Sequence, residues 1–171
     1  MIGRLVTIGV YGSTVDEFLD ALRAADVDVL LDVRQRRGVR GPQYAWANSQ
    51  RLQQALAETG IAYRHLKDLA PTTEMRQAQY AADAAKGEGK RTRTVLSDAY
   101  TRAYVERILD PADLDELLGG LDESVTAALL CVERDARACH RGLIADRLAA
   151  EYGVPVEHLV PSESRDAPAP R

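Results

Sequence analysis

Five short runs of apolar, mostly β-branched residues recur along the chain and predict β-strands. The runs cover residues 5–10, 27–33, 61–66, 125–131 and 156–160. Nearly every position in them is apolar, which is typical of strands buried on both faces of a sheet. The pattern therefore predicts a mainly parallel sheet covered by helices on both sides.

Helical periodicity fills most of the stretches between these runs. Thr14 is followed three residues later by Glu17, the form of a capping box, so a helix is expected directly after the first strand. Ser49 is expected to cap a second helix, which Gly60 ends. Strands that alternate with helices in this way indicate βαβ units.

Three further helices are expected in the second half of the chain. The first covers residues 94–109. The second covers residues 111–118, with Asp110 as its cap and Pro111 in the first helical position. The third covers residues 142–152, after the fourth strand.

Two stretches stand outside this alternation. Residues 67–93 are mostly polar or alanine and hold no strand pattern, so we expect a mobile insertion with one short helix near residues 74–86. The final residues 162–171 are polar and rich in proline, and we expect them to be disordered. The prediction is one three-layer, Rossmann-like α/β domain over residues 1–161, with about five strands flanked by helices.

Composition limits the class of protein further. The 171 residues are 46% hydrophobic and 28% charged, as in soluble globular domains. The net charge of −4 excludes a protein that coats nucleic acid through its overall charge, although a local basic patch can still bind phosphates. No long apolar run and no signal-like N-terminus occur, so we expect a cytoplasmic protein without membrane contact. Cofactor and oligomeric state stay open.

Ligands of parallel α/β sheets bind outside the carboxyl ends of the strands. The segments expected at that edge are residues 11–13, 34–42, 67–70 and 132–140. They, together with the end of the third strand, supply our first candidate ligand-binding residues, which are Tyr11, Ser13, Arg34, Arg36 and His65.

A dense run of chemically active residues follows the fourth predicted strand. It has the form Cys-x-Glu-Arg-Asp-x-x-x-Cys-His-Arg over residues 131–141. Together with Thr7-Ile8-Gly9, Asp32-Val33-Arg34 and His65-Leu66 at the earlier strands, this run resembles the family catalogued as "domain of unknown function 488". The resemblance extends from about Thr7 to Leu159.

The resemblance implies an α/β fold and gives functional weight to residues at the strand ends. These are Asp32, Arg34, Cys131, Glu133, Arg134, Asp135, Cys139, His140 and Arg141. The chain departs from the family pattern at Val10 and Tyr11, where members often carry His-Ser or Tyr-Glu. It departs again in the second loop, where Arg37 and Val39-Arg40-Gly41 replace a proline followed by Ser-Arg-Lys. These departures leave room for a different specificity.

The start of the helix after this run is a candidate anion site. Free backbone N–H groups and the helix dipole favour anions there, and Arg34, Arg134 and Arg141 can add bidentate contacts to a phosphate or carboxylate. The alternative is structural: Glu133 and Asp135 cap the helix and pair with those arginines.

The two cysteines are expected to be reduced thiols with different roles. Cys131 and Arg137 match the C-x5-R spacing of phosphatase and rhodanese loops, but nearby Glu133 disfavours a thiolate, and a buried packing role is the alternative. Cys139 is better placed for reactivity if the helix begins near it, because a helix N-terminus lowers a thiol pKa.

His140 is the candidate general acid or base, together with a carboxylate from Asp32 or Glu133. A histidine that only caps the helix or bonds in the core is the competing interpretation. Cys131, Cys139, His140 and a carboxylate could supply four metal ligands, but the paired short spacings of zinc ribbons are absent, so no metal site is predicted.

The loop over residues 34–46 packs arginines with Tyr44 and Trp46. The arginines are predicted to bind phosphates, whereas Trp46 is expected to anchor the loop to the core. Our first hypothesis is an enzyme acting on a phosphorylated nucleotide or nucleic-acid ligand, with Asp32, Glu133, Cys139 and His140 as its catalytic residues. The alternative is a non-catalytic nucleic-acid-binding module that uses the arginines between Arg34 and Arg40.

Overall fold

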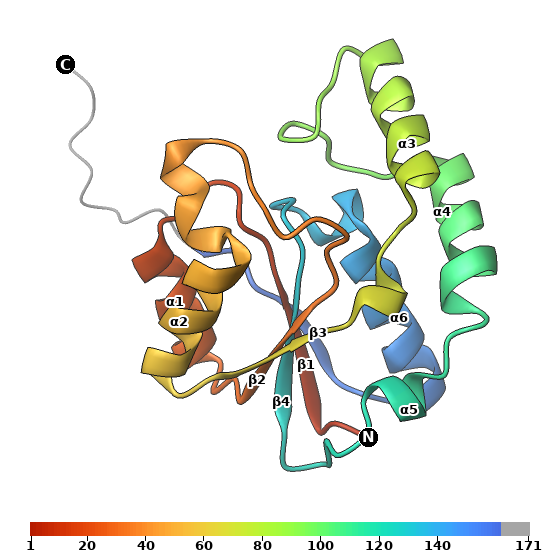
Figure 1. Ribbon diagram of the computed structural model, residues 1–171. Coiled ribbons are helices and arrows are strands. Elements are labelled where there is room, and N and C mark those ends of the chain that lie inside the picture. Colours follow the sequence, from red (N-terminus) through yellow and green to blue (C-terminus); the bar gives the residue numbers. More distant parts are fainter. Residues whose placement is uncertain (162–171) are drawn as a thin grey trace.

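A computed structural model describes residues 1–161 and places five parallel strands in one sheet (Figure 1). The strands are β1 (Arg4–Ile8), β2 (Val29–Asp32), β3 (Ala62–His65), β4 (Thr126–Leu130) and β5 (Val156–His158), in the spatial order β3-β2-β4-β1-β5. All four pairings are parallel. The predicted parallel sheet flanked by helices is confirmed.

Helices cover both faces of this sheet. The helices α1 (Val15–Ala24) and α2 (Ser49–Thr59) pack on one face, against side chains such as Val6 and Leu30. The other face, which includes Leu5 and Leu31, is covered by α4 (Asp98–Tyr104), α5 (Leu114–Leu117) and α6 (His140–Tyr152). The helix α3 (Thr73–Ala85) rises beyond the carboxyl ends of the strands (Figure 1). Within residues 1–161, no helix has the length and apolarity needed to cross a membrane.

The chain diverges between the neighbouring strands β2 and β4. After β2 it runs through α2 to the edge strand β3, and after β4 it runs through α6, on the other face, to the opposite edge strand β5. The loops that follow β2 and β4 therefore lead away from each other at the carboxyl edge, and a point of this kind is where open α/β sheets bind ligands. The topology directs attention to the loop between β4 and α6.

Helix caps test the expected boundaries of the first two helices. Thr14 and Glu17 form the predicted capping box, and Gly60 ends α2 in the left-handed conformation with φ 79°. The prediction that Ser49 caps α2 is wrong. Asn48 is the residue at the cap, and its side chain accepts a hydrogen bond from the N–H of Val39 instead.

The predicted start of the helix near residue 111 is also wrong. The helix α5 begins at Leu114, and Asp113 caps it by accepting the N–H of Glu116. Asp110 instead ends the preceding helical turn and pairs with Arg147 of α6. The expected helix over residues 94–109 begins later, at Asp98 after the cap residue Ser97, and its last turn, Val105–Leu109, is a π-helix.

The segment over residues 67–93 contains the one predicted α-helix, α3, after a short 3-10 turn at Lys67–Leu69. Its mobility stays a prediction. Near its end Arg93 is buried, so the segment docks onto the carboxyl edge of the sheet. The expected disorder of residues 162–171 falls outside the described residues.

Candidate functional site

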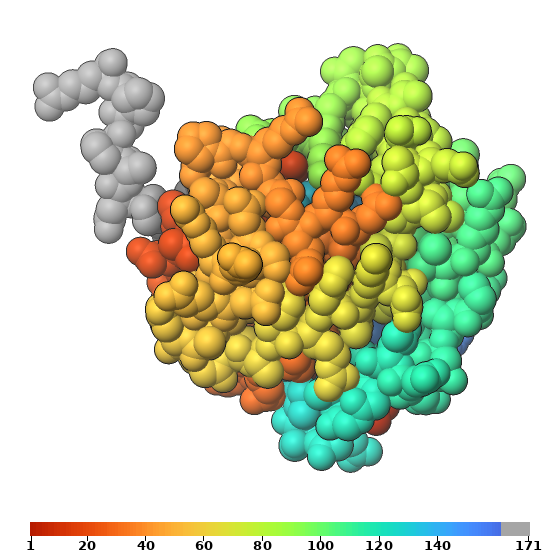
Figure 2. Space-filling view, in the orientation of Figure 1, coloured from red at the N-terminus to blue at the C-terminus, as the bar shows by residue number. Residues whose placement is uncertain are grey.

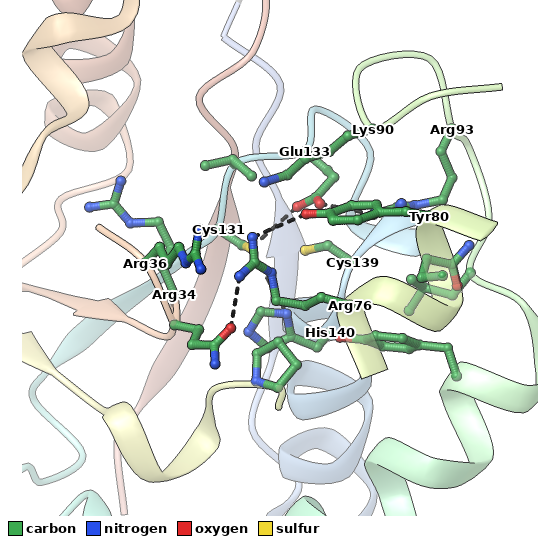
Figure 3. A pocket seen from close by; sticks show the side chains of 16 residues that line it. Arg34, Arg36, Arg76, Tyr80, Lys90, Arg93, Cys131, Glu133, Cys139 and His140 are labelled. Carbon is green, nitrogen blue, oxygen red and sulfur yellow. Dashed lines mark hydrogen bonds and ion pairs between the residues drawn. The ribbon is translucent and has the colours of Figure 1, made fainter. Parts of the chain in front are cut away.

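A cavity of about 50 Å³ lies at the carboxyl ends of β2 and β4 (Figure 3). Its walls come from the loop after β2, from α3 with the connection that follows it, and from the loop between β4 and α6. The last stretch contributes Cys131, Glu133, Cys139 and His140. Residues predicted from separate parts of the sequence therefore do meet at one cavity.

Cys131, Glu133 and His140 are in direct contact. The Sγ atom of Cys131 donates a hydrogen bond to Oε2 of Glu133 at 3.2 Å and lies 3.9 Å from Nδ1 of His140. Nε2 of His140 lies 2.7 Å from the carbonyl oxygen of Val33. Because a carbonyl can only accept, Nε2 carries the proton, and in a neutral ring Nδ1 presents its lone pair to Cys131.

Cys139 lies at the cap position of α6, which begins at His140, two residues before the expected start, and its environment differs from the expected one. The thiol is buried, and NH1 of Arg141 donates a hydrogen bond to its Sγ at 3.0 Å. Burial raises the pKa of Cys139 well above its usual range, and this outweighs the charge of Arg141. The expectation that the helix N-terminus lowers this pKa is wrong, because desolvation dominates.

Arg93 connects the insertion to the site. Its guanidinium binds Asp83 of α3 at 2.6 Å, Glu133 at 2.9 Å and the carbonyl oxygen of Ala138 at 3.0 Å. Burial acts to lower the pKa of Arg93, but the charges of Glu133 and Asp83 raise it overall. Glu133 is thus held between a buried arginine and the Cys131 thiol.

Asp32 lies below the cavity and holds Arg34. Its carboxylate accepts hydrogen bonds from Nε and NH2 of Arg34 at 2.9 and 2.8 Å and from the hydroxyl of Tyr63 at 2.6 Å. Burial acts to raise the pKa of Asp32, but the hydrogen bonds and charge of Arg34 bring it below its ordinary value. Asp32 is therefore placed to orient Arg34, whose carbonyl also bonds to His65.

Arg141 and Arg134 support the loop between β4 and α6. Arg141 is buried and donates to the carbonyl oxygens of Glu133 and Arg134 at 2.6 and 3.0 Å. Arg134 reaches the carbonyl of Gly12 in the loop after β1. Both side chains thus position the loop and lie outside the lining of the cavity.

Arg137 and Asp135 pair with each other on the surface. Two hydrogen bonds join the carboxylate of Asp135 to the guanidinium of Arg137, whose side chain is 75% exposed. The hydrogen bonds from Arg137 lower the pKa of Asp135. Because Arg137 does not line the cavity with Cys131, the C-x5-R spacing forms no phosphatase-type loop here.

Three cations around the cavity have no carboxylate partner among the described residues. They are Arg36, Arg76 and Lys90. Arg76 extends from α3 and donates to two neutral groups, Oε1 of Gln35 at 2.8 Å and the hydroxyl of Tyr80 at 3.1 Å (Figure 3). Glu133, which already binds Arg93, is the one carboxylate in the described lining.

A broader groove adjoins the cavity and shares Arg36, Arg76 and Lys90 with it. It has a volume of about 630 Å³ and adds Arg40 and Arg91 to the basic lining, with no carboxylate among the described residues that line it. The orange loop after β2 and the yellow-green part of α3 face each other across this region of the surface in Figure 2. The groove is thus a local basic patch on an acidic protein.

Two tyrosines hold Arg91 in this groove. Its guanidinium lies 5.2 Å from the ring centre of Tyr11 and 5.4 Å from that of Tyr44. The ring of Trp46 packs on that of Phe18, with 4.9 Å between the ring centres. This contact confirms that Trp46 anchors the loop after β2 to the core. Ser13 is buried, and its hydroxyl has no hydrogen-bond partner among the described residues.

Glycines allow the loop between β4 and α6 to pack closely. A Cβ atom on Gly9 would lie 2.0 Å from the carbonyl oxygen of Glu133, and one on Gly142 would lie 2.5 Å from that of Ala136. Neither distance is compatible with a side chain. Gly9 therefore sets the contact that places the backbone of Glu133 beside the end of β1.

The structure divides the predicted residues into two groups. Those lining the cavity are Arg34, Arg36, Glu133, Cys139 and His140. Those placed elsewhere are Tyr11, Ser13, Asp32, His65, Arg134, Asp135 and Arg141. Sequence reasoning missed Arg76, Lys90 and Arg93. The cluster of basic residues at the end of the insertion was a signal for Lys90 and Arg93, whereas Arg76 lies apart from it.

Comparison with known proteins identifies one family. The family described as "domain of unknown function DUF488" matches residues 14–148. No curated protein and no solved structure matches the chain.

Proposed function

The chain belongs to the DUF488 family, and from that premise and the geometry of the cavity we propose that it is an enzyme acting on a phosphorylated ligand. The ligand class is a nucleotide or another nucleic-acid component. Its phosphate would bind among Arg36, Arg76 and Lys90, and its reacting bond would lie beside Glu133.

The observation that carries this proposal is the charge of the cavity. Arg36, Arg76 and Lys90 lack carboxylate partners among the described residues, although the whole chain carries net charge −4. Cations gathered without counter-charges repel one another, and a bound dianion relieves that repulsion. Arginine also matches phosphate oxygens in bidentate geometry.

Glu133 is the group best placed for proton transfer. Its Oε2 atom contacts the Cys131 thiol, while Arg93 holds Oε1. This arrangement fixes the carboxylate at the cavity wall, where it can take a proton from a bound water or hydroxyl. Asp32 then acts as a positioning residue that holds Arg34.

Phosphate binding tests the recognition half of the proposal. We expect Arg76→Ala and Lys90→Ala each to weaken the binding of a nucleoside monophosphate about tenfold, roughly 1.4 kcal/mol, by isothermal titration calorimetry. Arg51→Ala is the matched control, because Arg51 is exposed on α2 away from the cavity. Equal affinity in all four proteins would refute the assignment.

Turnover tests the catalytic half. Glu133→Gln keeps the shape of the side chain and should retain phosphate binding within a few fold while losing at least a hundredfold in kcat, the usual range for general acid–base catalysis. A panel of nucleoside phosphates and short oligonucleotides supplies the substrates. Retention of the wild-type kcat in this variant would remove Glu133 from the mechanism.

The basic groove favours a second candidate function, a nucleic-acid-binding module. Arg36, Arg40 and Arg91 line it together with Tyr11, and cations interleaved with aromatic rings are typical of single-strand binding. A module of this kind should bind a single-stranded oligonucleotide with strong salt dependence. The logarithm of the binding constant falls as the logarithm of the salt concentration rises, and each arginine removed should make this slope shallower by roughly 0.7. Salt-independent binding would exclude this alternative.

A further inference from the structure

We propose that Cys131, Cys139 and His140 form a binding site for a borderline-soft divalent metal ion such as Zn²⁺, with one coordination position open to the cavity. The inference goes beyond phosphate binding, because it uses three side chains that form no hydrogen bond with the proposed phosphate-binding residues Arg36, Arg76 and Lys90. It also revises the expectation from sequence that no metal site is present.

The three ligand atoms already lie close together. The Sγ atoms of both cysteines and a ring nitrogen of His140 are within 4.8 Å of one another. Ligands of a tetrahedral zinc ion with ordinary Zn–S and Zn–N bonds are separated by roughly 3.5–3.8 Å. The 3.9 Å between Cys131 Sγ and His140 Nδ1 is near this value. Small rotations of side chains would complete the geometry.

The histidine is oriented as a metal ligand. Its Nε2–H group donates to the carbonyl of Val33 at 2.7 Å, so the Nδ1 lone pair is free to face Sγ of Cys131, 3.9 Å away. Metal-binding histidines commonly donate their other ring N–H to a carbonyl or carboxylate in this manner. The ring of Tyr104, 5.4 Å away between centres, packs against the imidazole and limits its rotation.

Charge favours a divalent ion at this buried position. One divalent ion bound by two thiolates replaces two thiol protons, so the net charge of the cluster does not change. The N–H group of Arg141 that contacts Cys139 at 3.0 Å can remain as a donor to the thiolate sulfur. Thiolate and imidazole ligands together select Zn²⁺-like ions over Mg²⁺ or Ca²⁺.

The fourth position faces the proposed substrate. All three ligands line the cavity, as does Glu133, whose Oε2 atom is 3.2 Å from Cys131 Sγ. Two cysteines and one histidine with an open fourth position form a known ligand set of catalytic zinc. An ion here would bind water next to Glu133. The sequence suggests these three residues as ligands but lacks the paired short spacings of a zinc ribbon, because the ligands come from a strand end and a helix start.

Cobalt binding tests the proposal directly, in the absence of any phosphate ligand. Full-length protein that has been treated with chelator and reductant is titrated with Co²⁺, which reports thiolate ligation by charge-transfer absorption in the near ultraviolet. We expect saturation at one ion per chain, displacement by Zn²⁺, and a rise of several degrees in Tm with Zn²⁺. A wild-type protein that shows no charge-transfer band would overturn the proposal.

Variants assign the ligands and separate this inference from the proposed function. Cys131→Ser and Cys139→Ser should each reduce the charge-transfer intensity by about half, and His140→Gln should weaken Co²⁺ binding at least tenfold. His158→Gln is the matched control, since His158 bonds to Thr7 on β1. Arg76→Ala should keep the full cobalt spectrum while losing phosphate affinity. An unchanged spectrum in both cysteine variants would refute the ligand set.

Discussion

Asp32 shows how the surroundings of one residue decide its role. It ends β2 at the edge where ligands are expected, yet its carboxylate is fully buried and bound by Arg34 and Tyr63. These hydrogen bonds stabilise the ionised form, which is why the pKa of Asp32 lies below its ordinary value despite burial. The carboxylate therefore contributes to stability, and through Arg34 to the shape of the cavity.

This arrangement predicts a stability difference that depends on pH. Tyr63→Phe removes the hydroxyl that donates to Asp32, so the variant should unfold about 1–2 kcal/mol more easily near neutral pH. Because the folded pKa of Asp32 is depressed, its contribution is complete above the ordinary aspartate value of 3.8 and is lost as pH falls through the folded value. The gap between variant and wild type should therefore narrow below pH 3.8 in guanidinium denaturation experiments.

Tyr104→Phe is the matched control for this experiment. The hydroxyl of Tyr104 donates to the carbonyl of Leu69 at 2.6 Å, an acceptor that does not titrate. Its stability loss should stay constant over the same acidic range. A gap for Tyr63→Phe that is equally constant would show that Asp32 is not the titrating partner.

The ends of the helices could be predicted from sequence where the local capping residues agree with the packing of the folded chain. The capping box at Thr14 and the glycine at residue 60 set the boundaries of α1 and α2, and both signals are local. Asp110 was the expected cap of α5, whereas Asp113 is the residue that caps it, and the difference involves a distant partner. Asp110 pairs with Arg147 of α6, so Asp113 is left to cap the helix. A contact of this range cannot be read from the local sequence.

The contact between two loops at the carboxyl edge gives the second prediction. Gly9→Ala would push a Cβ atom into the carbonyl of Glu133, so we expect a loss of about 1–3 kcal/mol in unfolding free energy. Gly89→Ala is the matched control, because no atom lies within 4 Å of its added Cβ atom. Guanidinium denaturation measures both. A tolerated Gly9→Ala would mean that the loop is not held at this distance.

Across the whole molecule, the insertion is joined to the sheet by a buried ionic network. Arg93 binds both Asp83 of α3 and Glu133, which lies forty residues after Arg93 in the chain, and the three side chains are at most 7% exposed. A charge pair of this kind is costly to break, because the remaining partner stays buried without compensation. The network thus couples the folding of α3 to the shape of the cavity.

The third prediction concerns this network. Arg93→Met should lower the unfolding free energy by about 3–5 kcal/mol, measured by chemical denaturation, since two buried carboxylates lose their partner. Arg23→Met is the control, because its pair with Asp20 is exposed and should contribute at most about 1 kcal/mol. Adding Asp83→Asn and Glu133→Gln to Arg93→Met should restore part of the loss. No recovery would point to lost packing rather than to unpaired charge.

Across the whole site, the residues at the strand ends could be predicted from sequence, and those contributed by residues 67–93 could not. The topology of a parallel sheet brings the ends of β2 and β4 together, so the meeting of Arg34, Glu133 and His140 follows from sequence pattern and fold class. Arg76 and Lys90 could not be placed in this way. Their positions depend on how the insertion docks, which is decided by buried contacts such as that between Arg93 and Glu133.

The cavity takes its two kinds of side chain from different stretches of the chain. Cys131, Glu133 and His140 lie around the end of β4, whereas Arg76 and Lys90 belong to the long link between β3 and α4. Under the proposed function, changing Arg76 and Lys90 in that link while Asp83 and Arg93 are kept would alter the anion that is held and leave Glu133 in place. Related proteins could thus bind different anions through changes in this one segment, while the reactive groups around the end of β4 stay the same.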